Sequence, residues 1–309
     1  MEVEAFITVL LSASLRASIP MLLAALGEAY NEKGGILNLG IEGMMLGGAF
    51  SGFAVALITG SVFLGFMTGV AVGAISGLIF AYLSVTLKLD QIITGIGFTI
   101  LMVGLTGFLY RYFYGRNFPT LGVSKKTLAI PFLSKIPVIG PVLFDQHVVV
   151  YLTLLLIPLL HWILFHTTFG LNIRAVGETP GAADAAGVNV AQIRYLVAVF
   201  AGAMAGLGGA FLSLGNLSLF VPGETQGIGY IAIAMAMLGK WSPYRVFIGA
   251  WLFGMVESLA VGLQIIAVPV QPEFILMLPY VGVIVAMVFL ARNARLPAKL
   301  MLPYERGER

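Results

Sequence analysis

The chain has 309 residues, of which 59% are hydrophobic and only 10% are charged, and its mean hydropathy is +0.99. A soluble protein of this length needs far more polar surface, so the composition excludes a soluble domain and indicates a polytopic membrane protein. The absence of cysteine excludes disulfides and thiolate metal sites, and the net charge of +3 matters less than where the charges lie.

Nine apolar segments are candidates for membrane spans. They run approximately over residues 5–27, 36–59, 62–87, 91–110, 147–166, 195–215, 227–239, 246–264 and 273–291. The seventh is short, which indicates a tilted or partly re-entrant piece. The acidic start, MEVEAF, does not have the basic pattern of a cleavable signal peptide. We therefore expect an all-α bundle of about 8–10 spans in a single transmembrane domain, residues 1–309.

Basic residues predict the orientation of this bundle, because they collect in cytoplasmic loops. With nine spans the termini lie on opposite sides. A cytoplasmic C-terminus puts eleven basic residues inside, namely Lys33, Lys88, Arg174, Arg194, Lys240, Arg245, Arg292, Arg295, Lys299, Arg306 and Arg309. Five then lie outside, namely Arg111, Arg116, Lys125, Lys126 and Lys135. We expect the C-terminus in the cytoplasm.

Two stripes of small residues predict close helix packing. On the third span they recur at every fourth position, at Gly65, Gly69, Gly73, Gly77 and Ala81. On the sixth span they are Ala198, Gly202, Gly206 and Ala210. Such stripes indicate a dense bundle, packed either within the chain or against a partner subunit.

A long external loop, residues 111–146, carries four prolines and five basic residues. Its second half is too apolar for a disordered linker. We interpret residues 128–144 as an interfacial element that supports a docking surface, with a passive crossover as the alternative.

A short polar island, RAVGETPGAADAAG at residues 174–187, lies between two long apolar stretches. Thr179 is a candidate N-cap, Pro180 suits the first helical position, and Gly187 suits the left-handed residue that ends a helix. The pattern predicts a helix of about seven residues, roughly 10 Å long. It has almost no apolar face, so it suits a knob that fits a groove on another protein; an ordinary loop is the alternative.

Few ionisable residues fall inside the predicted spans, and each is a candidate for a pathway or an internal ion pair. They are Arg16, Glu42 and Glu257, and Arg16 is a candidate partner for either carboxylate. Glu42 lies in GGILNLGIEGMM, residues 34–45, where glycine and polar residues interrupt an apolar run. Irregular backbone of this kind is tolerated at depth where it lines a cavity, and Asn38 shares a helical face with Glu42.

No pattern of an enzyme, a metal site or a cofactor site is present. The pair Gly239-Lys240 is followed by Trp241 and lacks the upstream glycine of a phosphate loop, so the chain is not expected to hydrolyse ATP. The histidines His147, His161 and His166 do not have metal-ligand spacing. We expect no catalytic residues, no metal, no cofactor and no nucleic-acid partner.

Four motifs together resemble the permease subunits of bacterial ATP-binding-cassette (ABC) importers for branched-chain amino acids, simple sugars and nucleosides. They are NEKGGILNLGIEGMMLGGAF at 31–50, RAVGETPGAADAAGVNV at 174–190, GGAFLSLG at 208–215 and GIGYIAIAMAMLGKWSPYRVFIGAWLFG at 227–254. The motifs NLGIEGMM and VGETPGAADAAG are most similar to nucleoside permeases that work with basic membrane lipoproteins. This subgroup is distinct from the ribose type with its GGIDLSVG pattern.

The resemblance implies an ABC importer permease fold in the bacterial plasma or inner membrane, surrounded by lipid. It also implies an ABC ATPase subunit, an extracytoplasmic substrate-binding lipoprotein and a second permease, usually a different and longer one. The cytoplasmic loop of about 168–194 would carry a coupling helix that docks on the ATPase. The residues carried over to this role are Arg174, Gly177, Glu178, Thr179, Pro180, Ala182, Ala183, Ala186 and Gly187.

The substrate pathway is assigned to polar positions at depth, where a nucleoside needs hydrogen-bonding groups and aromatic surface. They are Asn38, Glu42, Gln91, Thr94, Asn216, Glu224 and Gln226, with Phe98, Phe220 and Tyr230 as the aromatic candidates. Helix packing is the alternative role at each position. An ABC permease for simple sugars such as ribose, an ion-coupled secondary transporter, and a structural membrane subunit are the alternative functions.

Overall fold

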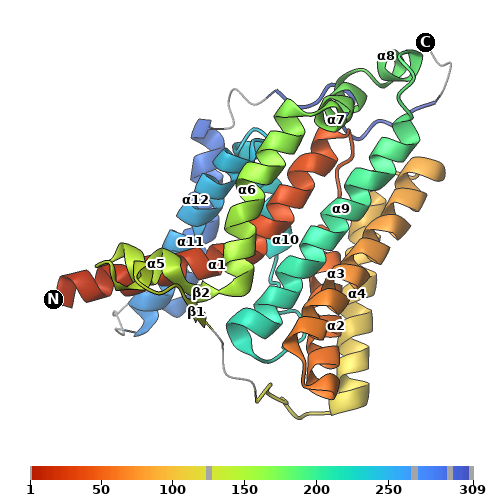
Figure 1. Ribbon diagram of the computed structural model, residues 1–309. Helices are drawn as coiled ribbons and strands as arrows, with labels where there is room; N and C mark the ends of the chain where they lie inside the picture. The colour runs from red at the N-terminus through yellow and green to blue at the C-terminus, as the bar shows by residue number, and fades with distance from the viewer. Residues whose placement is uncertain (1, 123–126, 266–270, 291–294, 306–309) are drawn as a thin grey trace.

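Figure 1 shows the computed structural model, which describes residues 2–122, 127–265, 271–290 and 295–305. Among the basic residues used to predict orientation, Lys125, Lys126, Arg292, Arg306 and Arg309 lie outside these ranges.

Seven of the described helical segments are long and apolar enough to cross a membrane. They are α1 (Glu2–Lys33), α2 (Ile41–Thr59), α3 (Val62–Ala81) with the π-helical turn η1 (Tyr82–Thr86), α4 (Gln91–Tyr114), α6 (Val148–His166), α9 (Val190–Ala210) with the π-helical turn η3 (Phe211–Leu217), and α11 (Pro243–Ile265). Two further apolar helices, α10 (Ile228–Leu238) and α12 (Pro272–Leu290), coincide with the remaining predicted segments. The predicted all-α polytopic bundle is confirmed.

The expected 8–10 spans included α10, which is too short to cross alone. Its eleven residues extend over roughly 16 Å, about half of a hydrocarbon core of roughly 30 Å. The chain descends through α9 and η3, turns back through residues 218–227, and rises again as α10. The seventh segment is thus short, as expected, and its tilted or partly re-entrant path through the membrane stays a prediction.

Two helix boundaries differ from the apolar segments in the sequence. Helix α1 continues through a polar turn to Lys33, and α2 begins at Ile41, so residues 34–40 form an irregular connection. The helix can include this polar turn because Glu28, Asn31 and Glu32 are fully buried and two of them accept hydrogen bonds from neighbouring segments.

The two small-residue stripes meet each other inside the chain, on facing sides of α3 and α9. A Cβ atom added at Gly73 would collide with the carbonyl oxygen of Gly202, and one added at Gly206 would collide with that of Gly69. The glycines therefore allow the two backbones to touch. This settles the alternative left open by the sequence, because the stripes pack within the subunit.

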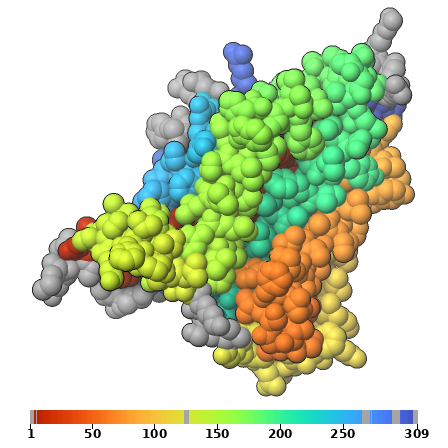
Figure 2. Space-filling view, viewed as in Figure 1, coloured from red at the N-terminus to blue at the C-terminus, as the bar shows by residue number. Residues whose placement is uncertain are grey.

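The remaining elements lie at the two ends of the bundle (Figure 1). Helices α7 (Thr168–Glu178) and α8 (Pro180–Ala185) share one end with the last described residues of the chain, 295–305, and we refer to it as the α7–α8 end. Towards the other end lie the strands β1 (Thr127–Ala129) and β2 (Asp145–His147), with the 3₁₀ turn η2 (Leu133–Lys135) and α5 (Ile139–Phe144) between them. In Figure 2 this hairpin protrudes beside the start of α1, on the side away from α8.

The segment predicted as an interfacial element, residues 128–144, forms most of this hairpin, and the structure does not exclude the alternative of a passive crossover. Its strands pair antiparallel, with Leu128 opposite Gln146. Phe132 is 85% exposed and Ile139 is 54% exposed. Its proposed role in docking stays a prediction.

Candidate functional site

A buried polar network joins the end of α1 to the irregular connection that follows it. The Glu28 carboxylate accepts hydrogen bonds from the backbone N–H of Asn38 at 2.8 Å and from the side-chain amide of Asn31 at 3.3 Å. The Glu32 carboxylate accepts a hydrogen bond from the indole N–H of Trp241. Because these polar groups have no access to water, their partners fix the geometry of the connection.

Two of the predicted pathway residues hold the same connection in place. The amide oxygen of Gln91 accepts a hydrogen bond from the backbone N–H of Leu37 at 2.9 Å. The side chain of Asn38 accepts one from the N–H of Gly40 at 2.9 Å. Both side chains are buried. These contacts shape the backbone of the connection, and a place for the two side chains in the substrate pathway stays a prediction.

Glu42 binds the start of the half-length helix α10. Its carboxylate accepts three hydrogen bonds, from the hydroxyl of Thr225 at 2.6 Å, from the N–H of Gly227 at 2.8 Å and from the N–H of Gly229 at 2.7 Å. A carboxylate at this position satisfies free N–H groups and complements the positive end of the helix dipole. Gly229 is required here, since an added Cβ would lie 2.6 Å from the Glu42 Cα.

The hypothesis that Arg16 pairs with Glu42 is therefore wrong, as the carboxylate is already occupied by α10. Arg16 is exposed on α1, and its Nε donates to the carbonyl of Ser12 at 3.3 Å. Within the described ranges, the ion pair observed is that of Lys88 with Glu305, so the alternative pairing of Arg16 with Glu257 is also not formed.

Beside the Glu42 cap, three polar or aromatic side chains are exposed around the start of α10. Gln226 is exposed, Tyr230 is 41% exposed and Tyr280 of α12 is 43% exposed. The hydroxyl of Tyr280 donates to the backbone carbonyl of Gln226 at 3.3 Å. We refer to Gln226, Tyr230 and Tyr280 as the half-helix surface. Helix α10 begins at this surface and ends at Leu238, just before Trp241, which contacts the end of α1. The half-helix surface therefore lies about one half-span from the α7–α8 end.

The other predicted pathway residues do not join this surface. Glu224 is buried, accepts a hydrogen bond from the N–H of Val221 at 3.1 Å, and lies in the connection between η3 and α10. Burial raises the pKa of the Glu224 carboxyl to about 8. Thr94 in the first turn of α4 and Asn216 in η3 are half-buried.

Of the aromatic candidates, Phe98 and Phe220 are buried in the core, and Phe220 packs against Phe50 and Tyr110 with ring centroids 5.3 and 5.5 Å apart. Tyr230 alone among the three is exposed.

The predicted short helix is present as α8, with six residues rather than about seven. Gly187 has φ +88°, as expected for the residue that ends it. Thr179 occupies the N-cap position but makes no side-chain cap hydrogen bond. Thr179 is also the residue that ends α7, and its backbone N–H donates to the carbonyl of Ala175.

One face of α8 is buried, although the sequence of this helix has almost no apolar face. Pro180 and Ala183 face inward, and Ala183 is only 5% exposed. The exposed positions are Gly181, Ala182, Ala185, Ala186 and Gly187. A partner that docks on α8 therefore meets this outer face, and Ala183 supports the helix from beneath.

Helix α7 is seated directly on the end of α1. A Cβ added at Gly177 would collide with the carbonyl oxygen of Lys33. The C-terminal segment, residues 295–305, crosses the same place. The N–H of Lys299 donates to the Gly177 carbonyl at 3.0 Å, the N–H of Met301 donates to the Gly35 carbonyl at 3.1 Å, and Arg194 donates to the Leu302 carbonyl at 3.0 Å.

Two residues of the approach to α8 also make contacts of their own. Glu178 accepts a hydrogen bond from the N–H of Ala298 at 3.2 Å. The guanidinium of Arg174 lies 5.4 Å from the ring centroid of Phe165. These contacts join the approach to α8 to the segment 295–305 and to α6.

Sequence reasoning missed Glu28, Glu32, Trp241 and Tyr280. A signal for the first two was present, since Glu28 and Glu32 are one helical turn apart and follow an apolar run without a break. No group of three histidine, aspartate or glutamate residues that could hold a metal ion occurs in the described part of the chain. The half-helix surface offers hydrogen-bonding and aromatic groups.

Comparison with known proteins agrees with this arrangement. The family described as "Branched-chain amino acid transport system / permease component" matches residues 10–291. The chain is 40% identical to a putative glucose ABC transporter permease protein of Haloferax volcanii, over 85% of this chain and 80% of that protein. It is 33% identical to a guanosine ABC transporter permease protein of Bacillus subtilis, over the full length of both.

A nucleoside ABC transporter permease protein of Lactococcus lactis is likewise 33% identical, over 96% of each chain. No solved structure gives a significant match. The chain is therefore a multi-pass membrane protein without enzymatic activity of its own, and it belongs to the branched-chain amino acid transport system permease family, as the permease component of an ABC transporter.

Proposed function

We propose that this chain, as one transmembrane domain, forms half of the translocation pathway of an ATP-driven nucleoside importer. The observation that carries the substrate class is the full-length similarity to the guanosine permease, supported by that to the nucleoside permease. The half-helix surface fits this class, because Tyr230 and Tyr280 offer aromatic faces to a base and Gln226 offers hydrogen-bonding groups.

A simple sugar is the second candidate substrate, since the putative glucose permease is 40% identical to this chain. Sugars also bind through aromatic faces and hydrogen bonds, so the half-helix surface does not separate the two classes. The ring nitrogens of a base add hydrogen-bonding groups that a sugar lacks.

The partners follow from the family, in which a permease works with an ABC ATPase and a substrate-binding protein. We propose that the exposed face of α8 docks on the ATPase, and that the α7–α8 end and the C-terminus lie in the cytoplasm. Lys33, Lys240, Arg245 and Lys299 all lie at this end, as expected of a cytoplasmic face. A different, longer permease would complete the pathway, and an extracytoplasmic lipoprotein would deliver the nucleoside to the opposite side.

The contacts described above offer a route for the ATPase motion. Helix α8 is continuous with α7, and Gly177 of α7 rests on Lys33 at the end of α1. From there the α1–α2 connection leads to Glu42, which is bonded to the start of α10. A tilt of α7 would therefore move the half-helix surface, which is what alternating access requires.

Uptake of labelled guanosine, uridine, glucose, ribose and leucine tests this proposal, in cells with and without the gene and with the neighbouring transport genes intact. Nucleoside uptake should disappear with the gene and on ATP depletion while the proton gradient is kept. Loss of sugar or leucine uptake instead would overturn the substrate class. Uptake that survives ATP depletion and collapses with the gradient would indicate an ion-coupled secondary transporter.

A further inference from the structure

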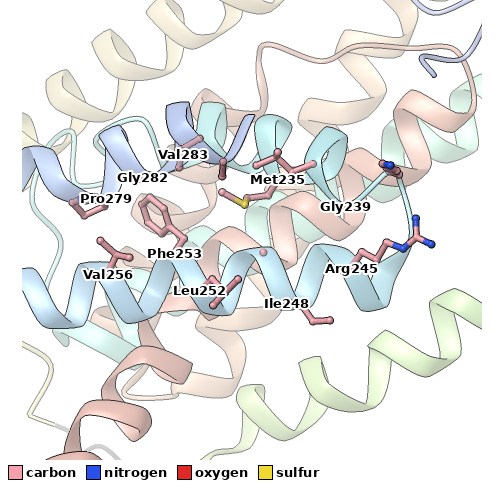
Figure 3. Close-up of a pocket in the computed structure, with 14 residues that line it drawn as sticks. Met235, Gly239, Arg245, Ile248, Leu252, Phe253, Val256, Pro279, Gly282 and Val283 are labelled. Atoms are coloured by element: carbon pink, nitrogen blue, oxygen red, sulfur yellow. The ribbon is translucent and has the colours of Figure 1, made fainter. Parts of the chain in front are cut away.

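Helices α10, α11 and α12 enclose an apolar groove with a volume of about 480 Å³ (Figure 3). Its walls include Met235 of α10, Leu252 and Phe253 of α11, and Val283 of α12. Gly282 keeps the α12 side open, because nothing lies within 4 Å of the position that a Cβ would take. The groove is separate from the contacts of Glu42 and from the three residues of the half-helix surface.

The charges along this groove are confined to one end. Among the described residues that line it, Lys240 and Arg245 are the two ionisable ones, and none is a carboxylate. Figure 3 shows Arg245 at one end, with Val256 and Pro279 at the other. The charged end is the α7–α8 end, since the neighbouring Trp241 is bonded to Glu32 of α1.

The turn that carries Lys240 is rigidly anchored. Lys240 and Trp241 have φ angles of +50° and +59°. Residues other than glycine rarely adopt this left-handed backbone conformation. Trp241 is only 2% exposed, so its burial holds the turn in this conformation. The anchored turn keeps one cation at the mouth of the groove, and Arg245 in the first turn of α11 supplies the second.

The length of the groove corresponds to one leaflet of a membrane. From Arg245 to Val256 along α11 is eleven residues, or roughly 16 Å of helix at about 1.5 Å per residue. This is about half of a hydrocarbon core of roughly 30 Å. An apolar groove of this depth with two cations at its mouth matches a lipid with an anionic headgroup.

We propose that this groove binds an anionic phospholipid, with the phosphate between Lys240 and Arg245 and one acyl chain along the α10–α12 wall. The described part of the apolar wall has no hydrogen-bonding side chain deeper than the two cations, so it does not suit a nucleoside or a sugar. A helix of a partner subunit would have to supply carboxylates to neutralise the two cations that it covers, because burying unpaired charges is costly. The proposal does not depend on the substrate, and in the orientation proposed above the lipid belongs to the inner leaflet.

Lipid binding to the intact purified transporter, with its ATPase and second permease, tests this proposal. The probes are phosphatidylglycerol, phosphatidylcholine with the same acyl chains, and inorganic phosphate, and bound lipid is measured by native mass spectrometry. The wild type should retain phosphatidylglycerol in preference to phosphatidylcholine. The double variant Lys240→Gln/Arg245→Gln should bind it about thirtyfold more weakly, the loss expected for two basic contacts with an anionic headgroup.

A second variant keeps the test independent of the charges. Gly282→Leu adds a larger side chain where a Cβ would have nothing within 4 Å, and it should abolish retention of both lipids by occupying the groove. Its control is Gly262→Leu, a glycine of α11 with equally open surroundings that does not line the groove. The charge control is Lys88→Gln, which removes a cation that pairs with Glu305 instead. Both controls should bind lipid like the wild type.

Three results would overturn the proposal. They are equal retention of the two lipids by the wild type, displacement of phosphatidylglycerol by millimolar inorganic phosphate, and crosslinking of the groove to the second permease. Uptake is not used as a readout, so this test can fail while the proposed importer function stands.

Discussion

The bond between Glu42 and α10 can be tested by removing its charge. The substitution Glu42→Gln keeps the size of the side chain but replaces one of its two acceptor oxygens by an NH₂ group. This NH₂ group then faces at least one of the three donors. Hydrogen bonds to a charged group contribute about 1.5–3 kcal/mol each, and a counter-charge at a helix N-terminus adds about 0.3–2 kcal/mol. The variant should therefore lose about 2–5 kcal/mol of stability.

A loss of this size lowers the midpoint of thermal unfolding by roughly 4–20 °C, at about 2–4 °C per kcal/mol. The assay is the Tm of the purified permease in detergent, measured together with substrate uptake in proteoliposomes. The matched control is Glu273→Gln, the same change at an exposed carboxylate of α12. The control should have the Tm of the wild type, and Glu42→Gln should lose stability and uptake together.

Two results would contradict this reasoning in different ways. An unchanged Tm and unchanged uptake would mean that the carboxylate does not hold α10. An unchanged Tm with lost uptake would make Glu42 a substrate contact, as the polar pattern of residues 34–45 first indicated.

Three further predictions follow from burial. Ala185→Arg, on the exposed face of α8, should leave the Tm unchanged but abolish co-purification of the ATPase. Ala183→Arg, at a buried position, should lower the Tm. The reverse pattern would mean that the two faces of α8 are wrongly assigned. Gly73→Ala, at the α3–α9 contact, should prevent accumulation of folded protein in the membrane. The control Gly104→Ala, on the open surface of α4, should accumulate normally. Equal yields of the two variants would refute the packing argument. The pKa of Glu224 is raised in the folded state to about 8, so its contribution to stability is present below about pH 4.5 and is lost as the pH rises towards 8. The Tm should therefore fall over this range, and less in Glu224→Gln; equal slopes in the two proteins would exclude a raised pKa.

Patterns that depend on a regular period were predictable from the sequence. The spans follow from apolar length, and the stripe Gly65, Gly69, Gly73 and Gly77 on α3 predicted a close helix contact. The identity of the contacting helix was open, because a stripe specifies one surface and not its partner. The structure supplies the partner, since the carbonyls of Gly202 and Ala198 on α9 occupy the space of the missing side chains.

Contacts between distant segments were not predictable in the same way. Glu28 and Glu32 fall at the polar end of an apolar run, which is also the pattern of a helix that emerges into water. Their burial depends on Asn38 and Trp241, which are ten and 209 residues away in the chain. Ala183 was assigned to an outward face because a six-residue helix of small residues carries no periodic signal that separates its two sides.

The same long-range contacts explain why residues 34–45, in which glycine and polar residues interrupt an apolar run, are so well buried. A half-length helix has free N–H groups at membrane depth, where water cannot satisfy them. In this chain Glu42 satisfies two of these groups from the start of α2, and α2 in turn begins where the buried network of Glu28 and Asn38 places it. Substituting any one of these residues leaves another polar group unpaired, so the helix start and the connection are expected to shift as one unit. A transporter whose α10 moved alone would have to break the three bonds of Glu42 in each cycle, whereas movement of α10 together with α2 keeps them intact.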